Sequence, residues 1–482
     1  MCTSMKKHPL FLLSYLFILY SSSLQGQTAG DTLRLSLNDA LLLAEQENRA
    51  VQIAREGVDV ATQDKHILRS AWWPTITLTG EAIHTTTPIR LTKSVAELSD
   101  GRLQELEKVV VDEPLLEAIL QEVGSMDIGV NLAPRNTASV GANLMWPLFS
   151  GGKRIFATRV GNHSVALAYT AYESVLQRVT TTTAEVYMGV EVANVNVEVC
   201  RMALSSALEV VREARSMERE GIINKAERLA AEVDAAEVAS LLAEAHTRLT
   251  ITRAELGALL GLDSLYLLTT TPLLNITPLP SQEFFLQAIG NNPTVRATRI
   301  EKQLANENLH IEQGRYLPDI ALIGGYRLWS EGIDKGLIPR AFVGVGASWT
   351  LFDGTARERS ISKSRSLVRT AQLAEEQQQQ ELRVAVERLW GTLAESQNQL
   401  TTANTTISLT EELVRMRHKA FAEGMATASE VIRSEVKLAE AKLGRIAILY
   451  QWNVARAELF ALCGLSLTEN IQQQNKCDYE DE

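Results

Sequence analysis

The side chains that could support catalysis are present in this chain but are not arranged for it. The seven histidines stand far apart, and none forms a His-x-x-x-His pair. No Cys-x-x-Cys, His-Glu-x-x-His or Gly-x-Ser-x-Gly motif occurs. The run Gly151-Gly-Lys-Arg154 resembles a phosphate-binding loop only superficially, because Arg154 stands where such a loop needs Ser or Thr. We therefore expect no catalytic residue, no metal site and no cofactor, and we predict that the protein is not an enzyme.

Composition narrows the class of protein and its partners. The 482 residues are 45% apolar and 22% charged, which is enough for a packed core, and the formal net charge is −11. An acidic chain binds nucleic acid poorly, so none is expected as a partner. Residues 1–29 are typical of an export signal, with Lys6 and Lys7 before an apolar run and cleavage near 26 or 29. That apolar run is too short to span a bilayer as a helix.

The chain contains an internal repeat. The segment Trp146–Arg154 recurs as Trp349–Arg357 with five of nine residues identical. Likewise Arg253–Leu262 recurs as Arg456–Leu465 with eight of ten identical, and both pairs are separated by 203 residues. We infer that the chain is a duplicated unit.

Earlier segments repeat at a separation of 244 residues, which places Pro74 opposite Pro318. The difference of 41 residues indicates an insertion in the first half, at about 91–129, with a charged helix over 97–123. The predicted organisation is a signal over 1–29, a first repeat over 30–265, a connector over 266–281, a second repeat over 282–465 and an acidic tail over 466–482.

Each repeat is predicted to run helix, strand, loop, strand, helix, tight turn, helix. The first helical pattern begins at Ser36 and ends at about Ala71, before Pro74. Alternating residues predict strands, and proline-free stretches predict long helices that break only at Gly221 and Gly424. The predicted strands are 75–79, 139–149, 319–326 and 342–352, and the long helices lie within 155–262 and 360–465.

The last helix of each repeat carries two apolar lines. One has the three-four spacing of a coiled-coil seam, through positions 229, 233, 236, 240, 243, 247 and 250 and their counterparts 203 residues later. The other passes through Val238, Leu242, Ala245, Leu249 and Leu256. Helices with two seams pack on neighbours at both sides, which favours a wall of helices over a simple hairpin.

Aromatic residues gather where the predicted strands meet the helices. Trp72, Trp73, Trp146 and Trp349 are placed as in the girdle of a membrane interface, although a soluble sheet packed on helices would also collect aromatics there. Four strands cannot close a barrel, and open edges are not tolerated in a bilayer. Three chains would supply twelve strands, which is a feasible barrel, so the membrane interpretation requires oligomers.

Together these features resemble the TolC-type family of outer-membrane efflux and secretion channels, over roughly residues 32–465. Pro74 and Pro318 are similar to the family's joints between helix and barrel. The segments Leu148–Arg154 and Leu351–Arg357, which contain Gly151 and Gly354, are similar to its joints between strand and long helix. The second hairpin matches the family's aromatic-x-x-Gly-x-x-Thr turn at Phe421, Gly424 and Thr427, and Gly221 is the counterpart of Gly424 in the first.

The resemblance implies a mainly α fold with membrane β: long helical hairpins forming a periplasmic α-barrel, and four strands per chain joining a trimeric twelve-stranded β-barrel. It implies a homotrimer in outer-membrane lipid that extends into the periplasm. It also implies a periplasmic adaptor protein at the hairpin tips and an inner-membrane pump or transporter. Glu227 and Glu430 match acids that constrict the family's entrance, so a ring of carboxylates is expected there. A further family acid is Arg433 here, which leaves the charge of the entrance open.

We therefore predict the channel component of a tripartite efflux pump, or of a type I secretion system, that gives substrates a passive exit duct. The alternative is an exported coiled-coil stalk, structural or adhesive, without a pore. Drug, metal-cation and protein substrates are not separated by this sequence.

Overall fold

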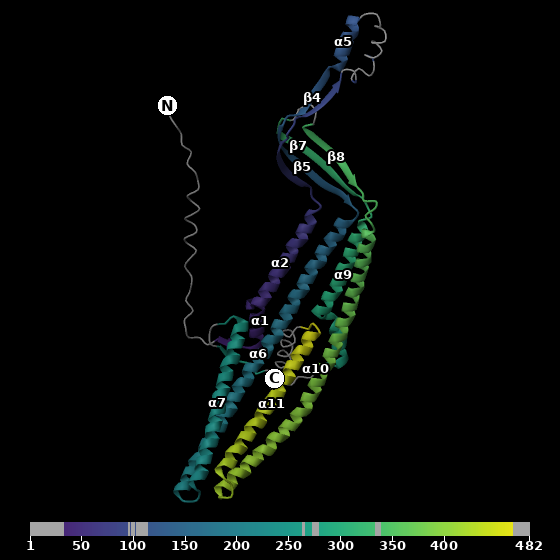
Figure 1. The fold of residues 1–482 in the computed structure, drawn as a ribbon. Coiled ribbons are helices and arrows are strands. Elements are labelled where there is room, and N and C mark those ends of the chain that lie inside the picture. The colour runs from purple at the N-terminus through teal and green to yellow at the C-terminus, as the bar shows by residue number, and fades with distance from the viewer. Residues whose placement is uncertain are drawn as a thin grey trace, which may run out of the picture.

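The computed structural model describes residues 33–94, 97, 102, 114–262, 266–271, 279–332 and 339–465. The protein is elongated and mostly helical, with a four-stranded sheet towards one end and the tips of two long helical hairpins at the other (Figure 1). The prediction of a mainly α fold with a few strands is confirmed. Within the described residues, no helix is both long and apolar enough to cross a membrane.

The helical segment that precedes the sheet is broken at an asparagine. α1 (Leu37–Glu47) and α2 (Arg49–Ser70) meet at Asn48, so the single helix predicted from Ser36 was wrong in this detail. The Asn48 side chain accepts from the amide of Ala50 and donates to the carbonyl of Leu259 at 3.0 Å. It therefore caps α2 and ties the break to a long hairpin.

The second half repeats this break. α8 (Gln282–Ala288) and the 3-10 helix η2 (Ile289–Asn291) lead to α9 (Pro293–Gly314), which begins after Asn292. Asn292 donates its side-chain amide to the carbonyl of Leu462 at 2.9 Å. These two residues lie 244 and 203 positions after Asn48 and Leu259, so both halves use the same tie.

The sheet is antiparallel, in the order β2-β5-β7-β8. Its strands are β2 (Thr75–His84), β5 (Asn136–Ser150), β7 (Asp319–Glu331) and β8 (Ala341–Ser348). β2 and β7 are longer than predicted, because each pairs along much of the long strand β5. β8 ends before the predicted residue 352, because its neighbour β7 begins at Asp319, the partner of Ser348.

The insertion pairs at its two ends. β3 (Ile89–Ser94) and β4 (Asp127–Ala133) form a separate antiparallel pair, and α5 (Pro114–Ser125) lies beyond them at the far end of the molecule (Figure 1). The sequence analysis did not predict these strands, although Ile128, Val130 and Leu132 alternate along β4, whereas the alternation in β3 stops at Lys93. Of the helix predicted over 97–123, the part from Pro114 onward lies in α5, and most of 97–113 lies outside the described residues.

The start of the described chain lies against the connector. β1 (Leu33–Leu35) pairs in parallel with β6 (Tyr266–Leu268). The buried hydroxyl of Tyr187 contacts the carbonyl of Leu35 at 3.1 Å and the hydroxyl of Thr270 at 2.8 Å. These contacts fasten both segments to the first hairpin. The signal and the acidic tail lie outside the described residues.

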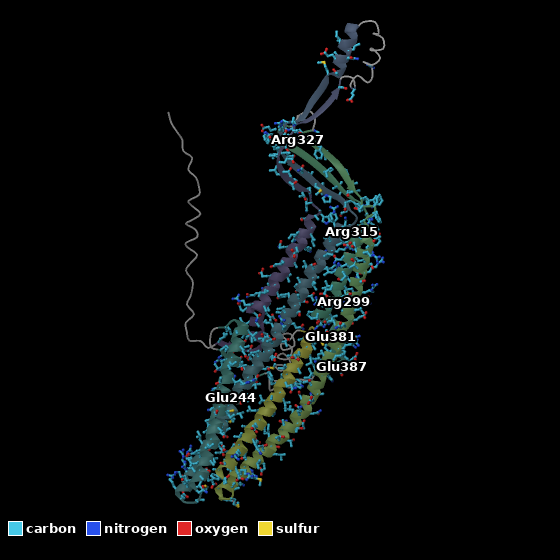
Figure 2. All side chains as sticks on the ribbon, viewed as in Figure 1. Glu244, Arg299, Arg315, Arg327, Glu381 and Glu387 are labelled. Carbon is cyan, nitrogen blue, oxygen red and sulfur yellow. The ribbon has the colours of Figure 1, made fainter. Side chains whose placement is uncertain are left out.

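Four long helices form the two hairpins. They are α6 (Lys153–Arg219), α7 (Lys225–Leu260), α10 (Ala356–Ala422) and α11 (Ala428–Leu462). α6 and α10 have 67 residues each, and a helix of that length extends about 100 Å. Charged side chains occur along the whole molecule, from Arg327 in the sheet and Arg315 beside it to Glu244 on α7 (Figure 2).

Apolar clusters join the hairpins, but one of the two predicted lines on α7 stays outside them. Val238, Ala245 and Leu249 of the second line are buried. Every residue of the line from 229 to 250 is exposed, whereas its counterparts on α11 are buried or half-buried. In this chain α11 packs against α6 and α7, and the equivalent face of α7 is open.

Candidate functional site

Both hairpins turn through a glycine in the left-handed region. Gly221 has a φ of +75° and Gly424 a φ of +73°. A Cβ atom at either position would meet nothing within 4 Å, so the backbone conformation rather than space favours glycine. The amide of Ile222 then donates to the carbonyl of Met217 at 2.9 Å, and Met425 closes the second hairpin in the same way.

The two glutamates expected at the entrance each begin the second helix of a hairpin. The amide of Glu227 donates to the side chain of Asn224 at 2.9 Å. The carboxylate of Glu430 accepts from the amide of Thr427 at 2.9 Å, and Arg417 lies 3.3 Å from it. The Thr427 hydrogen bond lowers the pKa of Glu430, with Arg417 adding to the effect. Glu430 is therefore held in its charged form but shares that charge with Arg417.

The tip residues expected to meet an adaptor divide into two groups. Gly221, Gly424 and Thr427 lie at the surface of the tips, but the ring of Phe421 is buried, with 1% exposed. Phe421 packs in the cluster that joins the hairpins, so its assignment as a docking contact is corrected. The exposed apolar side chains at the tips are Ile222 and Met425, which sequence analysis did not single out.

Polar contacts join the two hairpins near the tips. Arg433 of α11 lies 3.6 Å from the nearly buried Asp234 of α7. Glu435 of α11 accepts from the hydroxyl of Ser206 of α6 at 2.7 Å and contacts His418 of α10 at 2.8 Å. The residue that departs from the family pattern, Arg433, therefore links the first hairpin to the second.

The first joint between sheet and helix is held by an arginine. The Arg154 guanidinium lies 4.6 Å from the centre of the Trp72 ring and donates to the carbonyl of Leu148 at 2.8 Å. The indole of Trp146 donates to the carbonyl of Trp72 at 3.0 Å. One side chain at the start of α6 thus contacts both the end of α2 and the end of β5.

The second joint repeats these contacts. The Arg357 guanidinium lies 4.9 Å from the Tyr316 ring and donates to the carbonyl of Leu351 at 2.8 Å. The indole of Trp349 donates to the carbonyl of Tyr316 at 3.0 Å. Arg357 is buried and forms an ion pair with Asp353 at 3.1 Å. Sequence analysis quoted both arginines within the joint motifs but gave them no role.

The prolines and glycines of the joints mark where the backbone changes direction. Pro74 and Pro318 follow α2 and α9 directly before β2 and β7 begin. A Cβ atom on Gly151 would lie 2.3 Å from the carbonyl oxygen of Gly314, so the first joint needs glycine for close approach. The same atom on Gly354 would meet nothing within 4 Å, so the second joint is open at this point. Trp72, Trp73, Trp146 and Trp349 are all exposed around these joints.

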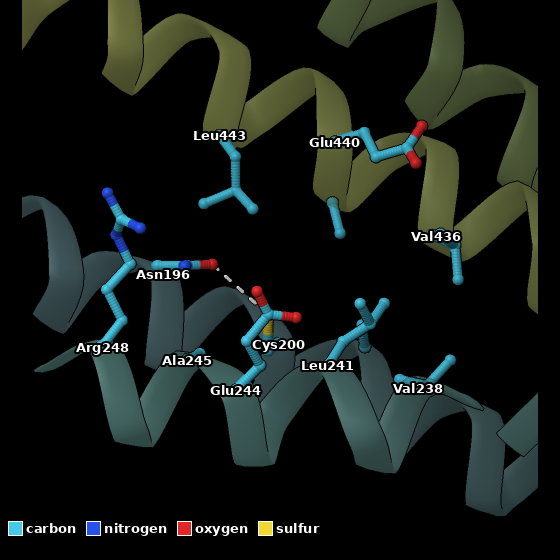
Figure 3. Close-up of a pocket in the computed structure, with 12 residues that line it drawn as sticks. Asn196, Cys200, Val238, Leu241, Glu244, Ala245, Arg248, Val436, Glu440 and Leu443 are labelled. Carbon is cyan, nitrogen blue, oxygen red and sulfur yellow. Dashed lines mark hydrogen bonds between the residues drawn. The ribbon is translucent and has the colours of Figure 1, made fainter. Parts of the chain in front are cut away.

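A groove runs between the first hairpin and α11 (Figure 3). It has a volume of about 260 Å³ and is lined by Asn196, Cys200, Leu241, Glu244, Val436 and Leu443, among others. Burial raises the pKa of the Cys200 thiol, so this thiol is poorly reactive at neutral pH. Within the described residues, no group of three or more His, Cys, Asp or Glu side chains could hold a metal ion.

Comparisons with known proteins agree on one family. The nickel-cobalt-cadmium resistance protein NccC of Alcaligenes xylosoxydans is 23% identical over 240 residues, which is 50% of this chain and 53% of that protein. The chain thus spans about half the length of this curated relative.

Two solved structures share the fold. CusC has a TM-score of 0.70 at 13% identity, over 91% of this chain and 95% of its own. The CmeC outer membrane channel of Campylobacter jejuni has a TM-score of 0.67 at 14% identity, over 91% and 89%. Residues 40–262 and 286–465 match the family described as outer membrane efflux protein. As the resemblance to TolC-type channels predicted, the chain belongs to the outer membrane efflux protein family.

Proposed function

We propose that this chain is the subunit of a trimeric outer-membrane channel, the passive exit duct of a tripartite efflux pump. The observation that carries the proposal is that one chain presents two open sides. The residues on each open side are the equivalents, through the internal repeat, of residues that pack between the two halves of the same chain. A further copy would supply the missing neighbour on each side.

The sheet supports a membrane position because its two faces differ. Directly opposed residues of an antiparallel sheet project to the same side. One face carries Ile76, Leu78, Leu144, Trp146, Leu322, Val343 and Val345. The other carries Thr75, Thr77, Thr79, Glu81, Ser139, Asn143 and Arg327, with a few apolar side chains among them. This is the pattern of strands with lipid on one side and a water-filled lumen on the other.

The sheet edges support closure with other copies. Among the described residues, the outer edges of β2 and β8 pair with no strand. Unpaired backbone groups are not tolerated in hydrocarbon, so β8 of one copy would pair with β2 of the next. Four strands from each of three copies give a barrel of twelve.

The helices show the same open sides. α9 packs against both α6 and α10, whereas α2 packs chiefly against α6. α2 exposes a stripe of Ile53, Val60 and Ile67, spaced by seven residues. The equivalent stripe on α9 is half-buried. α2 therefore lacks the second neighbour that α9 has, and α10 of another copy would provide it.

The hairpins give the most specific evidence for a neighbouring copy, because they carry two equivalent grooves of which only one is covered within the chain. A second groove of about 450 Å³ lies on α10 and α11, and six of its eight lining residues lie 203 positions after lining residues of the first groove. α11 covers the first groove through Val436, Ala439 and Leu443. The counterparts on α7, Val233, Ala236 and Ser240, are exposed. They would cover the second groove of the next copy.

In this arrangement the sheet lies in the outer membrane and the hairpins extend through the periplasm. A periplasmic adaptor protein would dock at the tips, around Ile222 and Met425, and an inner-membrane pump or transporter would supply the energy. The sequence carries no complete nucleotide-binding motif, which agrees with an external energy source. Metal cations are one candidate substrate class, since the name of NccC includes nickel, cobalt and cadmium.

Type I secretion would use the same duct. The alternative of a coiled-coil stalk without a pore accounts for the helices but not for a sheet with one apolar and one polar face. It would also predict a protein that needs no detergent.

The mass of the protein extracted from outer membranes in mild detergent tests the proposal. Light scattering corrected for bound detergent should give three chains, and the species should precipitate when detergent is removed. A water-soluble monomer or a filament of open-ended length would overturn the channel and favour the stalk.

A further inference from the structure

One side chain on the polar face of the sheet, that of Phe342, is apolar, although most side chains around it on this face are polar or are glycine. Phe342 of β8 lies opposite Gly325 of β7, which lies opposite Asn143 of β5, and Asn143 lies opposite Thr77 of β2. Opposed residues share a face, so the Phe342 ring projects on the side of the amide and the hydroxyl. In the proposed barrel this side is the lumen.

The ring has one covered side and one open side. A Cβ atom on Gly325 would lie 2.4 Å from Cε1 of Phe342, so the ring lies directly on the glycine backbone. Such packing of an aromatic on glycine supports a sheet. Yet Phe342 remains 53% exposed. This exposure is that of a single chain, in which β8 is an edge strand. In the proposed barrel β2 of the next copy would lie beside β8, and its side chains on this face are the polar Thr75, Thr77, Thr79 and Glu81. Cross-strand packing therefore accounts for the covered side, and no apolar neighbour accounts for the side that faces the lumen.

Two further apolar side chains lie on the same face. Met145 and Ile323 are direct partners in the register, one row from the pair formed by Asn143 and Gly325 on that face. Both are exposed. We refer to Phe342, Ile323 and Met145 as the lumen patch.

The internal repeat shows that the aromatic is specific to the second half. The equivalents of Gly325 and Phe342 in the first half are Glu81 and Ser139, at separations of 244 and 203 residues. These two are also direct partners, and the Ser139 hydroxyl contacts the Glu81 carboxylate at 3.1 Å. Three copies would therefore alternate polar pairs with aromatic rings around one level of the lumen.

We propose that the lumen patch is a contact site for organic solutes with aromatic or alkyl groups as they leave through the barrel, with Phe342 as its central residue. This inference rests on the proposed channel function. An apolar group laid on the open side of the ring leaves water, and an organic cation also gains attraction to the ring face. A small hydrated metal ion keeps its water shell and gains little from the patch.

Single-channel recording with two matched probes tests this site. Benzyltrimethylammonium and tetramethylammonium carry the same charge and differ by one aromatic ring. Each is added on the extracellular side, so that it reaches the barrel without passing the hairpin tips. The benzyl compound should block the current at lower concentration, and Phe342→Ala should raise its half-blocking concentration about threefold, the size of one exposed cation–π contact.

The controls separate the site from the fold. Val343→Ala changes the adjacent residue, which is exposed on the opposite face, and should leave the block unchanged. Phe342→Leu still covers Gly325 but lacks the ring, and should also weaken the benzyl block if Phe342→Ala fails to insert. Equal block by both probes in the unaltered protein, or a shift with Val343→Ala instead, overturns the lumen patch. Absence of any conducting pore would overturn the channel itself.

Discussion

At the scale of single residues, the two joints differ at one backbone position. Among the described residues, Thr355 is the one non-glycine with positive φ, at 69°. Its equivalent in the first joint is Gly152, with a φ of 79°. A β-branched residue in the left-handed region costs about 1 kcal/mol or more. We expect Thr355→Gly to raise the apparent unfolding temperature in detergent at a fixed scan rate, and Gly152→Ala to lower it. An unchanged midpoint for Thr355→Gly would show that no strain is held there.

The buried arginine of the second joint makes a larger contribution. Arg357→Met would leave Asp353 and the Leu351 carbonyl without the guanidinium, and we expect a loss of about 3 kcal/mol in stability. Arg357→Lys keeps the charge but not the planar stack on Tyr316, so its loss should be smaller. Arg359→Met, on the exposed side of the same helix turn, is the control. A midpoint for Arg357→Met equal to that of the control would contradict the assigned role.

The entrance glutamates make a prediction about ion selectivity. Replacing Glu227 and Glu430 together by Gln keeps side chains that can still accept hydrogen bonds at the helix ends, but removes their charges. If six carboxylates surround the mouth of the trimer, the preference for cations should fall several-fold in single-channel reversal potentials. Unchanged selectivity would leave Glu430 as a helix cap and Glu227 as a residue of the first turn of α7.

The same carboxylates should respond to pH in a defined direction. The hydrogen bond from Thr427 lowers the pKa of Glu430 below the ordinary value of 4.5. A group whose pKa lies below 4.5 is more than half charged at pH 4.5 and loses most of its charge only in more acid solution. In the Glu227→Gln variant, the remaining cation preference should therefore persist at pH 4.5. Loss of that preference between pH 6 and 5 would exclude Glu430 as its source.

At the scale of elements, the breaks at Asn48 and Asn292 connect the upper helices to the hairpins. Asn292 is nearly buried and bonds both the start of α9 and the carbonyl of Leu462. We expect Asn292→Ala to cost about 2 kcal/mol through loss of the cap and an unsatisfied carbonyl. Asn292→Asp keeps the cap but not the bond to Leu462, so its effect on the thermal midpoint should be intermediate. Equal effects would show that the bond to Leu462 alone matters, whereas an unchanged midpoint for Asn292→Asp would show that the cap alone matters.

These breaks also show what the sequence could and could not predict. The long helices were predictable, because helical periodicity without proline leaves little alternative over about 100 residues. Asn48 was missed because its helical pattern continues on both sides, and the reason for the break is a carbonyl more than 200 residues away. Tertiary contacts of that kind leave no local signal. Alignment of the two repeats, which places Asn48 opposite Asn292, would have indicated the break.

The candidate site divides in the same way. Turn glycines and joint prolines follow from backbone geometry and were identified from the sequence. The burial of Phe421 and the contact between Arg433 and Asp234 depend on how one hairpin lies on the other. The end of β8 likewise depends on where β7 begins. Spacing along one strand or helix does not determine a partner on another.

At the scale of the whole molecule, the internal repeat predicts which residues of neighbouring copies should lie close together, and this can be tested. Within one chain, Ala439 of α11 and Cys200 of α6 line the first groove together. Their equivalents are Ala236 of α7, which is exposed, and Ala403 of α10, which lines the second groove. If α7 covers the groove of the next copy, cysteines at 236 and 403 should be joined between chains by a short bis-maleimide linker.

The intramolecular pair calibrates this measurement. Ala439→Cys with the native Cys200 should be linked within one chain, and because the buried Cys200 thiol reacts slowly, this yield is the lowest expected for correct geometry. Ala236→Cys with Ala403→Cys, in a background where Cys200 and Cys477 are replaced by Ser, should give linked species of two and three chains and nothing larger. A ladder that continues beyond three chains would mean that the same contact propagates without closing, as in a filament. Single chains only, with the calibrating pair linked, would mean that the open face of α7 has another partner. A stop at three follows if the second half of one copy meets the first half of the next through the same rotation that relates the two halves of one chain, so that six half-units close the ring. In that case the contact between the two halves of one chain also describes the contact between neighbouring copies in the ring.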